Sequence, residues 1–472
     1  MAEITESKER KWAINGGAFV EEVKKAGKFA APMVAVTLMQ YLLQVVSVIM
    51  AGHLGELALS TVAIATSLTN VTGFSLLSGI VGGLETLCGQ AYGAQQYQKL
   101  GVYTYSAIIS LTLVCLPVCL LWIFMDKLLL LFGQDPTVSH EARNYSMWLI
   151  PALFGGAVLK PLTRYFQTQS LILPLFLSSF SVLCFHIPVC WFLVYKMGLG
   201  ATGTALTFSL STWLNVILLG FYAAYSSACE KTRAPLTAAA FHGIGLFFRL
   251  GVPSAVMTCL KWWSMELLVL LSGILPNPKL ETSVLSICLT ISTLHFNIPY
   301  AFGAAVSTRV SNELGAGNPE SARVAVMAVM FLAAIEAAVV STVLFSCRHI
   351  LGYAYSNVQQ VVHYVGVMMP LICLSVIMDS LQAVLSGVAR GCGWQRTGAY
   401  INLGAFYFVG LPVGVVLGFV AHLRGKGLWI GIVAGSIVQS TLLALVTTFT
   451  NWAKQAAKAK ERIFEEARRG DE

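Results

Sequence analysis

Long apolar runs alternate with short polar breaks along almost the whole chain. Each run is close to the roughly 20 residues that a helix needs to cross a bilayer, and no strand-like alternation competes with them. The breaks, such as residues 133–136 and 276–278, carry Gly, Pro or charge. The pattern predicts an all-α integral membrane protein with twelve transmembrane helices, at about residues 31–52, 62–85, 101–124, 145–168, 171–195, 201–225, 248–273, 283–308, 322–346, 360–386, 398–420 and 428–450.

The composition supports a membrane protein. Of the 472 residues, 56% are hydrophobic and only 11% are charged, a balance far from that of soluble domains. Residues 1–28 are charged and polar, so we predict no cleavable signal peptide. The 11 cysteines lie mostly within the predicted spans, without a CxxC motif. We interpret them as small packing residues, with a disulfide or metal framework as the alternative, and expect no cofactor.

The distribution of Lys and Arg predicts the orientation in the membrane. With a cytosolic N-terminus, 22 of the 30 basic residues fall on the cytosolic side, seven fall outside, and Lys261 lies within a span. This bias follows the positive-inside rule, so we expect both termini in the cytosol. The formal net charge of +8 then reflects topology. Nucleic-acid binding would need a basic face on a folded module, and the sequence shows none.

An internal duplication relates the two halves of the chain. A shift of 253 − 32 = 221 aligns Pro32 with Pro253, Thr37 with Thr258, Val48 with Val269, Gly52 with Gly273 and Leu54 with Leu275. Further groups match at shifts of 222, 224 and 227, among them Gln90 with Asn312 and Gly93 with Gly315. Six spans per half predict parallel repeats, with a substrate site between or within the halves near mid-depth.

The duplication divides the chain into five predicted units. These are a cytosolic N-terminal segment (1–30), an N-lobe (31–225), a cytosolic linker (226–247), a C-lobe (248–450) and a cytosolic C-terminal tail (451–472). We expect the tail to be a helix at the membrane surface. Nothing in the pattern calls for a second subunit, so we expect a monomer.

Acidic residues at membrane depth occur in the second half without counterparts in the first. Glu266 aligns with Val45, and Asp379 aligns with Gly156. A charge at membrane depth costs about 2.5–3.5 kcal/mol or more, so such residues are rare and usually functional. Burial favours the protonated form of a carboxylic acid. Both acids are therefore candidate proton carriers, with a structural hydrogen bond from a protonated acid as the alternative.

Four segments together resemble the multidrug and toxic compound extrusion (MATE) family in its plant form. They are residues 307–319 (STRVSNELGAGNP), 84–94 (LETLCGQAYGA), 50–55 (MAGHLG) and 389–395 (ARGCGWQ). The resemblance extends over residues 30–450. It implies a V-shaped exporter that moves organic cations, xenobiotics or plant secondary metabolites out of the cytosol, driven by inward protons. It also implies a plasma-membrane or vacuolar location.

The same resemblance implies roles for individual residues. The family's acids on the first and fourth helices of the second half map onto Glu266 and Asp379. Bacterial relatives often carry an aspartate on the first helix of the first half, where this chain has Ser47. The resemblance also implies an acid, as in many plant relatives, where this chain has Lys261. The family also links the proline of its first helix to bending during transport, so Pro32 is a candidate hinge, with a simple helix kink as the alternative.

The residues that precede Glu266 are candidates for substrate binding. Lys261 lies about 140° around the helix from Glu266, so we do not expect the two to share a face. Its interpretation is open between pairing with another acid, or snorkelling, and the selection of anionic or neutral substrates. Trp262 and Trp263 flank Glu266 on one side. They form a candidate platform for an organic cation, with packing or lipid contact as the alternative.

The sequence gives weaker evidence for a role of other polar residues in transport. Asn297 and Asn402 are candidates for a polar network around the acids. Glu85, Arg309 and Glu313 lie at cytosolic helix ends, where an inner-gate ion pair competes with ordinary solvated charge. His186 and His295 are lone histidines on apolar helices, which we interpret as satisfied core residues.

A proton-coupled antiporter with small organic substrates, cationic by preference, is the function that these observations favour. A lipid or glycolipid flippase of a related fold is the first alternative, but it should have a more cationic central cavity, and the second-half acids predict an acidic one. A facilitative channel stays open. An intramembrane enzyme would need a nucleophile–base pair or a metal-ligand cluster, and the sequence offers none. The expected partners are protons, the substrate and the bilayer.

Overall fold

A computed structural model of the protein describes residues 16–470, and helices form almost all of this part of the chain. Twelve helical segments are long and apolar enough to cross a membrane, which confirms the predicted fold class. They are Gly16–Gly52, Leu57–Gly93, Tyr97–Ile123, Pro136–Thr168, Ile172–Lys196, Gly200–Tyr225, Ala239–Ser272, Pro278–Ala316, Pro319–Ser346, Gln359–Cys392, Gln395–Val420 and Arg424–Thr448.

Most spans are single α-helices, and three contain π-helical turns. The single helices are α2 (Gly16–Gly52), α6 (Tyr97–Ile123), α8 (Pro136–Thr168), α10 (Gly200–Tyr225), α11 (Ala239–Ser272), α12 (Pro278–Ala316), α13 (Pro319–Ser346), α14 (Gln359–Cys392) and α17 (Arg424–Thr448). Span two comprises α3 (Glu56–Thr69), the π turn η1 (Asn70–Phe74), α4 (Ser75–Ile80) and α5 (Gly82–Gly93). Span five is α9 (Ile172–Trp191) with η2 (Phe192–Lys196), and span eleven is α15 (Gln395–Asn402), η5 (Leu403–Gly410), α16 (Leu411–Val415) and η6 (Val416–Val420).

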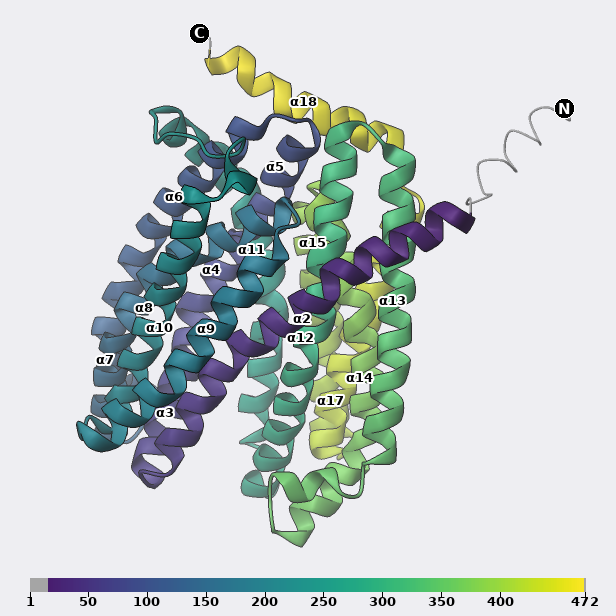
Figure 1. Ribbon diagram of the computed structural model, residues 1–472. Helices are drawn as coiled ribbons and strands as arrows, with labels where there is room; N and C mark the ends of the chain where they lie inside the picture. The colour runs from purple at the N-terminus through teal and green to yellow at the C-terminus, as the bar shows by residue number, and fades with distance from the viewer. Residues whose placement is uncertain (1–15, 471–472) are drawn as a thin grey trace, which may run out of the picture.

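The remaining elements lie in the connections and at the C-terminus. They are α7 (Met125–Leu131), η3 (Ser227–Cys229), η4 (Leu351–Ala354) and α18 (Trp452–Gly470). Figure 1 shows two helical bundles that meet at the end carrying α18 and diverge towards the opposite end. This V-shaped arrangement is the one that the resemblance implied.

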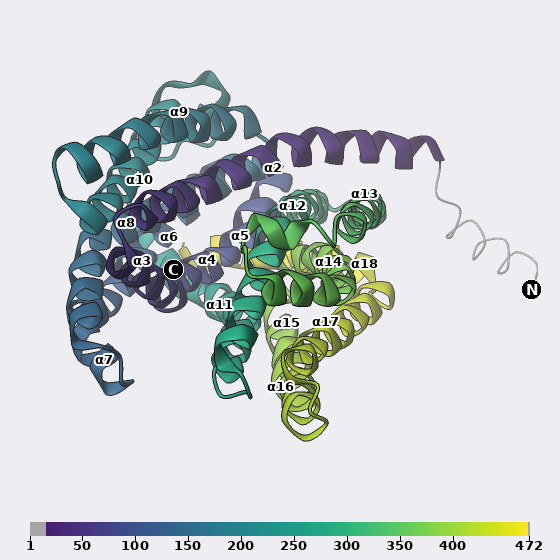
Figure 2. The same cartoon turned by 90° about the horizontal axis from the view of Figure 1, so that it is seen from below.

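The first helix of each half crosses from one bundle to the other. α2 begins against α12 and α13, where Arg309 Nε donates to Glu22 Oε1 at 2.6 Å, and continues along α9 and α10. α11 does the reverse: it begins against α4, α5 and α6, where Ser106 donates to the carbonyl of Ala240 at 2.7 Å, and ends against α15 and α17. The two helices lie on opposite sides of the seam (Figure 2). This exchange ties the duplicated halves together.

A reciprocal close contact marks the pseudo-symmetry of the halves. A Cβ placed on Gly93 would lie 1.9 Å from the carbonyl oxygen of Asn312, and one placed on Gly315 would lie 2.1 Å from that of Gln90. Gly93 aligns with Gly315 and Gln90 aligns with Asn312 at the same shift of 222. The same surface is therefore used by both repeats, as in a two-fold interface, and only glycine allows the backbones this close.

Both ends of the described chain pack against the rest of the protein more extensively than the residue pattern indicated. α2 begins at Gly16, so residues 16–30 belong to the first helix, and Ala26, Phe29 and Ala30 are buried. The tail forms α18, as expected for a helix, with Ile463 buried. It packs across the seam: Arg462 donates to Gln90 of the first half at 2.6 Å. The periodicity of apolar residues did not show these contacts, because alanines and charged residues contribute to them beside Phe29 and Ile463.

Candidate functional site

A central cavity of about 560 Å³ lies between the two halves. α2, span two and α8 form one wall, and α11, α12, α14 and α15 form the other. The π turn η1 contributes Asn70, Val71 and Phe74 to the first wall. The cavity lies where parallel repeats are expected to hold their substrate, and it is large enough for a small organic molecule.

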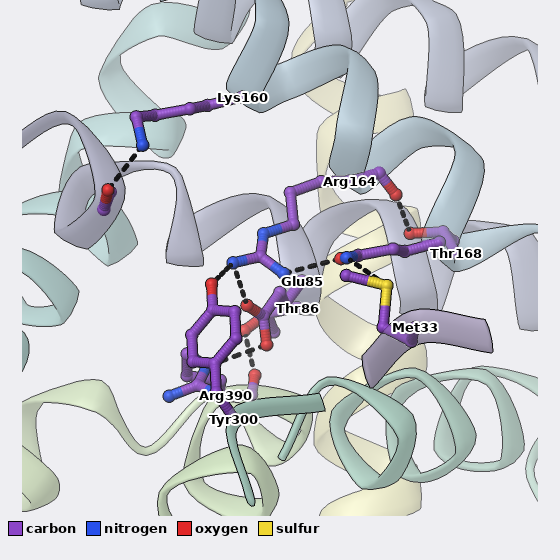
Figure 3. A network of polar contacts seen from close by, with 10 residues as sticks. Met33, Glu85, Thr86, Lys160, Arg164, Thr168, Tyr300 and Arg390 are labelled. Atoms are coloured by element: carbon purple, nitrogen blue, oxygen red, sulfur yellow. Dashed lines mark hydrogen bonds and ion pairs between the residues drawn. The ribbon is translucent and has the colours of Figure 1, made fainter. Parts of the chain in front are cut away.

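An ion-pair cluster closes the cavity at the end that carries α18. The Glu85 carboxylate lies 3.2 Å from Arg164 and 2.8 Å from Arg390, which come from α8 and α14. Arg164 also donates to the Tyr300 hydroxyl at 2.5 Å (Figure 3). Glu85 and Arg164 are less than a tenth exposed, so solvent screens this cluster little. One acid from the first half therefore joins the fourth spans of both halves.

Neutral hydrogen bonds surround this ion-pair cluster. The Thr86 hydroxyl donates to the carbonyl of Arg390, and Gln395 donates to Thr86 Oγ1 at 2.7 Å. Asn312 donates to the carbonyl of Thr168 at 3.1 Å. Each bond connects the two halves, so the closure involves backbone as well as charge.

The predicted gate residues divide into two clusters. Arg309 pairs with Glu22 at 2.6 Å and with Glu313 at 2.9 Å, beside the start of α2. Glu85 is not among these partners, so Glu85, Arg309 and Glu313 do not form one cluster. The sequence reasoning missed Arg164 and Arg390 as site residues, because it counted them only as topological charge. Their place near the same end of two equivalent spans was the available signal.

The two candidate proton carriers have different surroundings. Asp379 is 4% exposed, and its Oδ1 accepts a hydrogen bond of 2.8 Å from Lys261, which also donates to Gln382. Glu266 is half-buried at the cavity wall and makes no hydrogen bond or ion pair with any described residue. Of the roles considered for Lys261, the structure shows pairing with an acid. Lys261 and Glu266 nevertheless both line the cavity, which the helical angle alone did not predict.

Only one of the two tryptophans lines the cavity. Trp262 contacts the cavity and packs edge-on to Phe296, with ring centroids 5.5 Å apart. Trp263 is outside the cavity lining and 39% exposed. Of the two alternatives for Trp263, this position agrees with packing or lipid contact, because one residue along a helix turns the side chain by about 100°.

The two asparagines do not form a network around the acids. Asn297 donates to the carbonyl of Thr293 at 3.0 Å, and Asn402 donates to that of Met257 at 2.6 Å. Both line the cavity, but no hydrogen bond joins either of them to Glu266 or Asp379 among the residues that the structure describes. The amide of Asn402 instead connects α15 to α11, whereas that of Asn297 bonds within α12.

Pro32 lies inside α2, which continues through it. It lies between the contact that Glu22 makes with the C-terminal half and the hydrogen bond of 3.1 Å between Ser47 and His186 of the first half. A proline removes one helical hydrogen bond, so this stretch of α2 is less constrained than its neighbours. The geometry leaves the hinge role as a prediction.

Sequence reasoning missed a buried acid in the second half. Glu336 of α13 accepts hydrogen bonds from Ser380 at 2.8 Å and is 2.9 Å from His295 Nε2. An isolated acid within the ninth predicted span was the available signal. His295 Nε2 therefore has a carboxylate partner, but its buried Nδ1 makes no hydrogen bond with any described residue, so the expectation of a satisfied core histidine is met at one ring nitrogen only. This cluster is outside the cavity lining.

The cavity is not the acidic one that the sequence predicted. Lys160, Arg164, Lys261 and Arg390 line it together with Glu85 and Glu266. The topology argument counted Lys160, Arg164 and Arg390 only as charges on the cytosolic side, but each lies within a long helix at the cavity wall. The prediction of an acidic cavity failed because it considered only the charged residues at the centres of the spans.

Comparison with known proteins agrees with this architecture. The MatE family model matches residues 32–192 and again 253–416, and the offset of 253 − 32 = 221 is the shift of the internal duplication. Protein DETOXIFICATION 12 of Arabidopsis thaliana is 56% identical over 451 residues, which cover 95% of this chain and 94% of the relative. Protein DETOXIFICATION 14 of the same plant is 55% identical over 446 residues, covering 94% and 92%.

Solved structures show the same fold. The crystal structure of the eukaryotic MATE transporter AtDTX14 superposes with a TM-score of 0.92 at 55% identity, over 94% of this chain and all of that one (100%). A multidrug resistance MATE family transporter of the MOP superfamily, in its outward-facing conformation, matches with a TM-score of 0.83 at 14% identity, over 93% and 97%. The chain therefore belongs to the MATE family, whose members are membrane transporters and not enzymes, and resembles its plant DETOXIFICATION branch.

Proposed function

We propose that the protein is a proton-coupled antiporter that exports small organic substrates through the central cavity. Candidate substrates are organic cations, xenobiotics and plant secondary metabolites. The observation that carries the proposal is the Glu266 carboxyl group at the cavity wall, which has no partner among the described residues, in a duplicated fold whose first half has Val45 there. Both walls of the cavity come from one chain, so we propose a monomer as the transporting unit.

The positive-inside bias supports an orientation with α18 in the cytosol. In that orientation the Glu85 cluster closes the cytosolic end, so the described conformation opens away from the cytosol. Export then requires this cluster to separate and the opposite ends of the bundles to approach each other. We propose Pro32 as one hinge for that change. The target membrane is the plasma membrane or the vacuolar membrane.

The proposed coupling is competition at Glu266. An ionised Glu266 attracts an organic cation, and the face of Trp262 adds about 0.5–2 kcal/mol for a desolvated cation. A proton that binds Glu266 removes this attraction, so the protonated state favours release of the substrate. A ligand shifts a conformational equilibrium only through such a difference in affinity. A proton moving inward gains about 2.3 kcal/mol per 100 mV of membrane potential.

Asp379 has a second, linked role in this proposal. Its carboxylate is held by Lys261 at 2.8 Å, so a proton that binds Asp379 must displace an ammonium group. Lys261 would then be released towards the cavity, which it lines. We propose that Glu266 binds the first proton and that Asp379 binds a proton only when the Lys261 contact breaks.

Uptake into proteoliposomes tests the proposal. With an imposed pH gradient, purified protein should transport a permanently charged organic cation, and Glu266→Gln should abolish the dependence on the gradient. Glu320→Gln is the matched control, because Glu320 is exposed at the start of α13. Normal gradient-driven transport by the folded Glu266→Gln variant would show that the proton is carried elsewhere.

A lipid flippase is a second candidate, because the basic residues in the cavity remove the main argument against it. The same vesicles can contain a fluorescent lipid with an anionic head group. Lipid translocation without proton-driven uptake of any soluble compound would favour the flippase. A facilitative channel predicts flow of the substrate down its own concentration gradient, with no dependence on the proton gradient, and the Glu85 closure argues against it.

A further inference from the structure

Three of the four basic side chains that line the cavity have a carboxylate partner. Lys261 pairs with Asp379, and Arg164 and Arg390 both pair with Glu85. The fourth, Lys160, makes no ion pair with any carboxylate in the part of the chain that the structure describes. Its Nζ donates a hydrogen bond of 2.6 Å to the Ser78 hydroxyl.

Lys160 does not pair with Glu85, the acid of the ion-pair cluster. It lies one helical turn before Arg164 on the same face of α8. Both oxygens of Glu85 already lie against arginines. Figure 3 shows the Lys160 amine turned towards its hydroxyl partner and away from Glu85. Because an ammonium group at membrane depth is costly without a counter-charge, an anion from outside the chain is the natural partner.

The surrounding wall also offers unused hydrogen-bond donors. The side-chain amides of Gln40, Gln44 and Asn70 line the cavity and make no hydrogen bond with any described residue. They belong to α2 and η1 of the first half, as Ser78 belongs to α4. Besides the paired Arg164, this wall therefore combines one cation that has no carboxylate partner among the described residues with neutral donors. Glu266 and Trp262 face the cavity from the opposite wall.

We propose that Lys160 and these amides form an anion subsite that binds a carboxylate, or another anionic oxygen group, of the transported substrate. The preferred substrates are then amphoteric: an anionic group lies against Lys160 of the first half, and a cationic or aromatic part lies against Glu266 and Trp262 of the second. Such a molecule bridges the two halves. This inference rests on the proposed export function and names the substrate class for the same cavity.

A matched pair of dyes tests the subsite. One is a cationic xanthene dye with a free benzoate, and the other is its methyl ester, which keeps the cation and loses the anion. Equilibrium binding to purified protein, followed by fluorescence anisotropy, should give a loss of about tenfold for the benzoate dye in Lys160→Gln. Binding of the ester should be unchanged. Lys160→Arg should retain benzoate binding, and Lys279→Gln, on an exposed residue, is the control.

Several outcomes would overturn the subsite. Equal losses for both dyes would indicate a structural role for Lys160, and no loss for either would show that the amine does not face an anion. A third outcome is that phosphate competes equally with both dyes and that Lys160→Gln changes the affinities for the two dyes by the same factor. This outcome would assign Lys160 to a free inorganic anion. Because binding is measured without a gradient, failure of proton-driven uptake would refute the proposed function and leave this test intact.

Discussion

Lys261 and Asp379 form a buried ion pair of 2.8 Å between α11 and α14, although 118 residues separate them in sequence. Glu266 lies five residues beyond Lys261 on α11 and has no partner among the described residues. The two acids of the second half therefore differ in what a proton must displace. A mechanism that treats them as equivalent sites does not match this geometry.

Removal of one partner should destabilise the protein more than removal of both. Lys261→Met leaves the Asp379 carboxylate buried without its ammonium group, a loss of about 3–5 kcal/mol for a buried pair. Lys261→Met/Asp379→Asn should recover part of that loss. Thermal unfolding of the purified variants measures both effects, with the exposed Lys279→Met as control. Strictly additive effects would mean that the pair contributes no coupling.

Closure of the α18 end should depend on Glu85 and much less on Glu313. Glu85→Gln leaves Arg164 and Arg390 facing each other without a carboxylate, which should favour separation of the halves at that end. Glu313→Gln still leaves Arg309 paired with Glu22. Spin labels placed on either side of the seam in a cysteine-free background would report the distance between the halves. The same distance distribution in both variants would contradict the assignment of Glu85 as the closure.

Trp262 and Trp263 should differ in their effect on cation binding. Trp262→Ala should weaken binding of a permanently charged aromatic cation by about 2- to 30-fold, which corresponds to 0.5–2 kcal/mol. Trp263→Ala should leave it within about twofold, because Trp263 is outside the cavity lining. Equilibrium binding to the purified variants decides the matter, and equal effects would show that packing of α11, and not the cavity face, is responsible.

The affinity for that cation should rise with pH. Protonated Glu266 is neutral and attracts the cation less, so binding is weak at low pH and strengthens as the carboxyl group ionises. The direction follows from charge alone, because the ligand does not titrate. Glu266→Gln should flatten the dependence. A pH-independent curve for the wild type would exclude direct competition and leave protonation acting through a change in helix shape.

The sequence alone was sufficient for the membrane class, the twelve spans and the duplication. Their physical basis is local: a bilayer requires about 20 apolar residues per helix whatever the helix packs against. The shift that aligns Pro32 with Pro253 recurs as the offset between the two family matches. The isolated Glu266 was visible for the same reason, because a charge inside an apolar run stands out without any knowledge of its neighbours.

Tertiary structure decided which charges meet. Helix packing brings Asp379 to Lys261 and joins Glu85 to Arg164 and Arg390. Helix rotation excludes Trp263 from the cavity. These outcomes depend on how the long helices rotate and cross. The sequence does not determine this, because each helix is apolar on several faces that could pack in similar ways. Lys160 is the clearest example: in the chain it is one more basic residue near the end of a span, and only the assembled cavity shows that it pairs with no acid between residues 16 and 470.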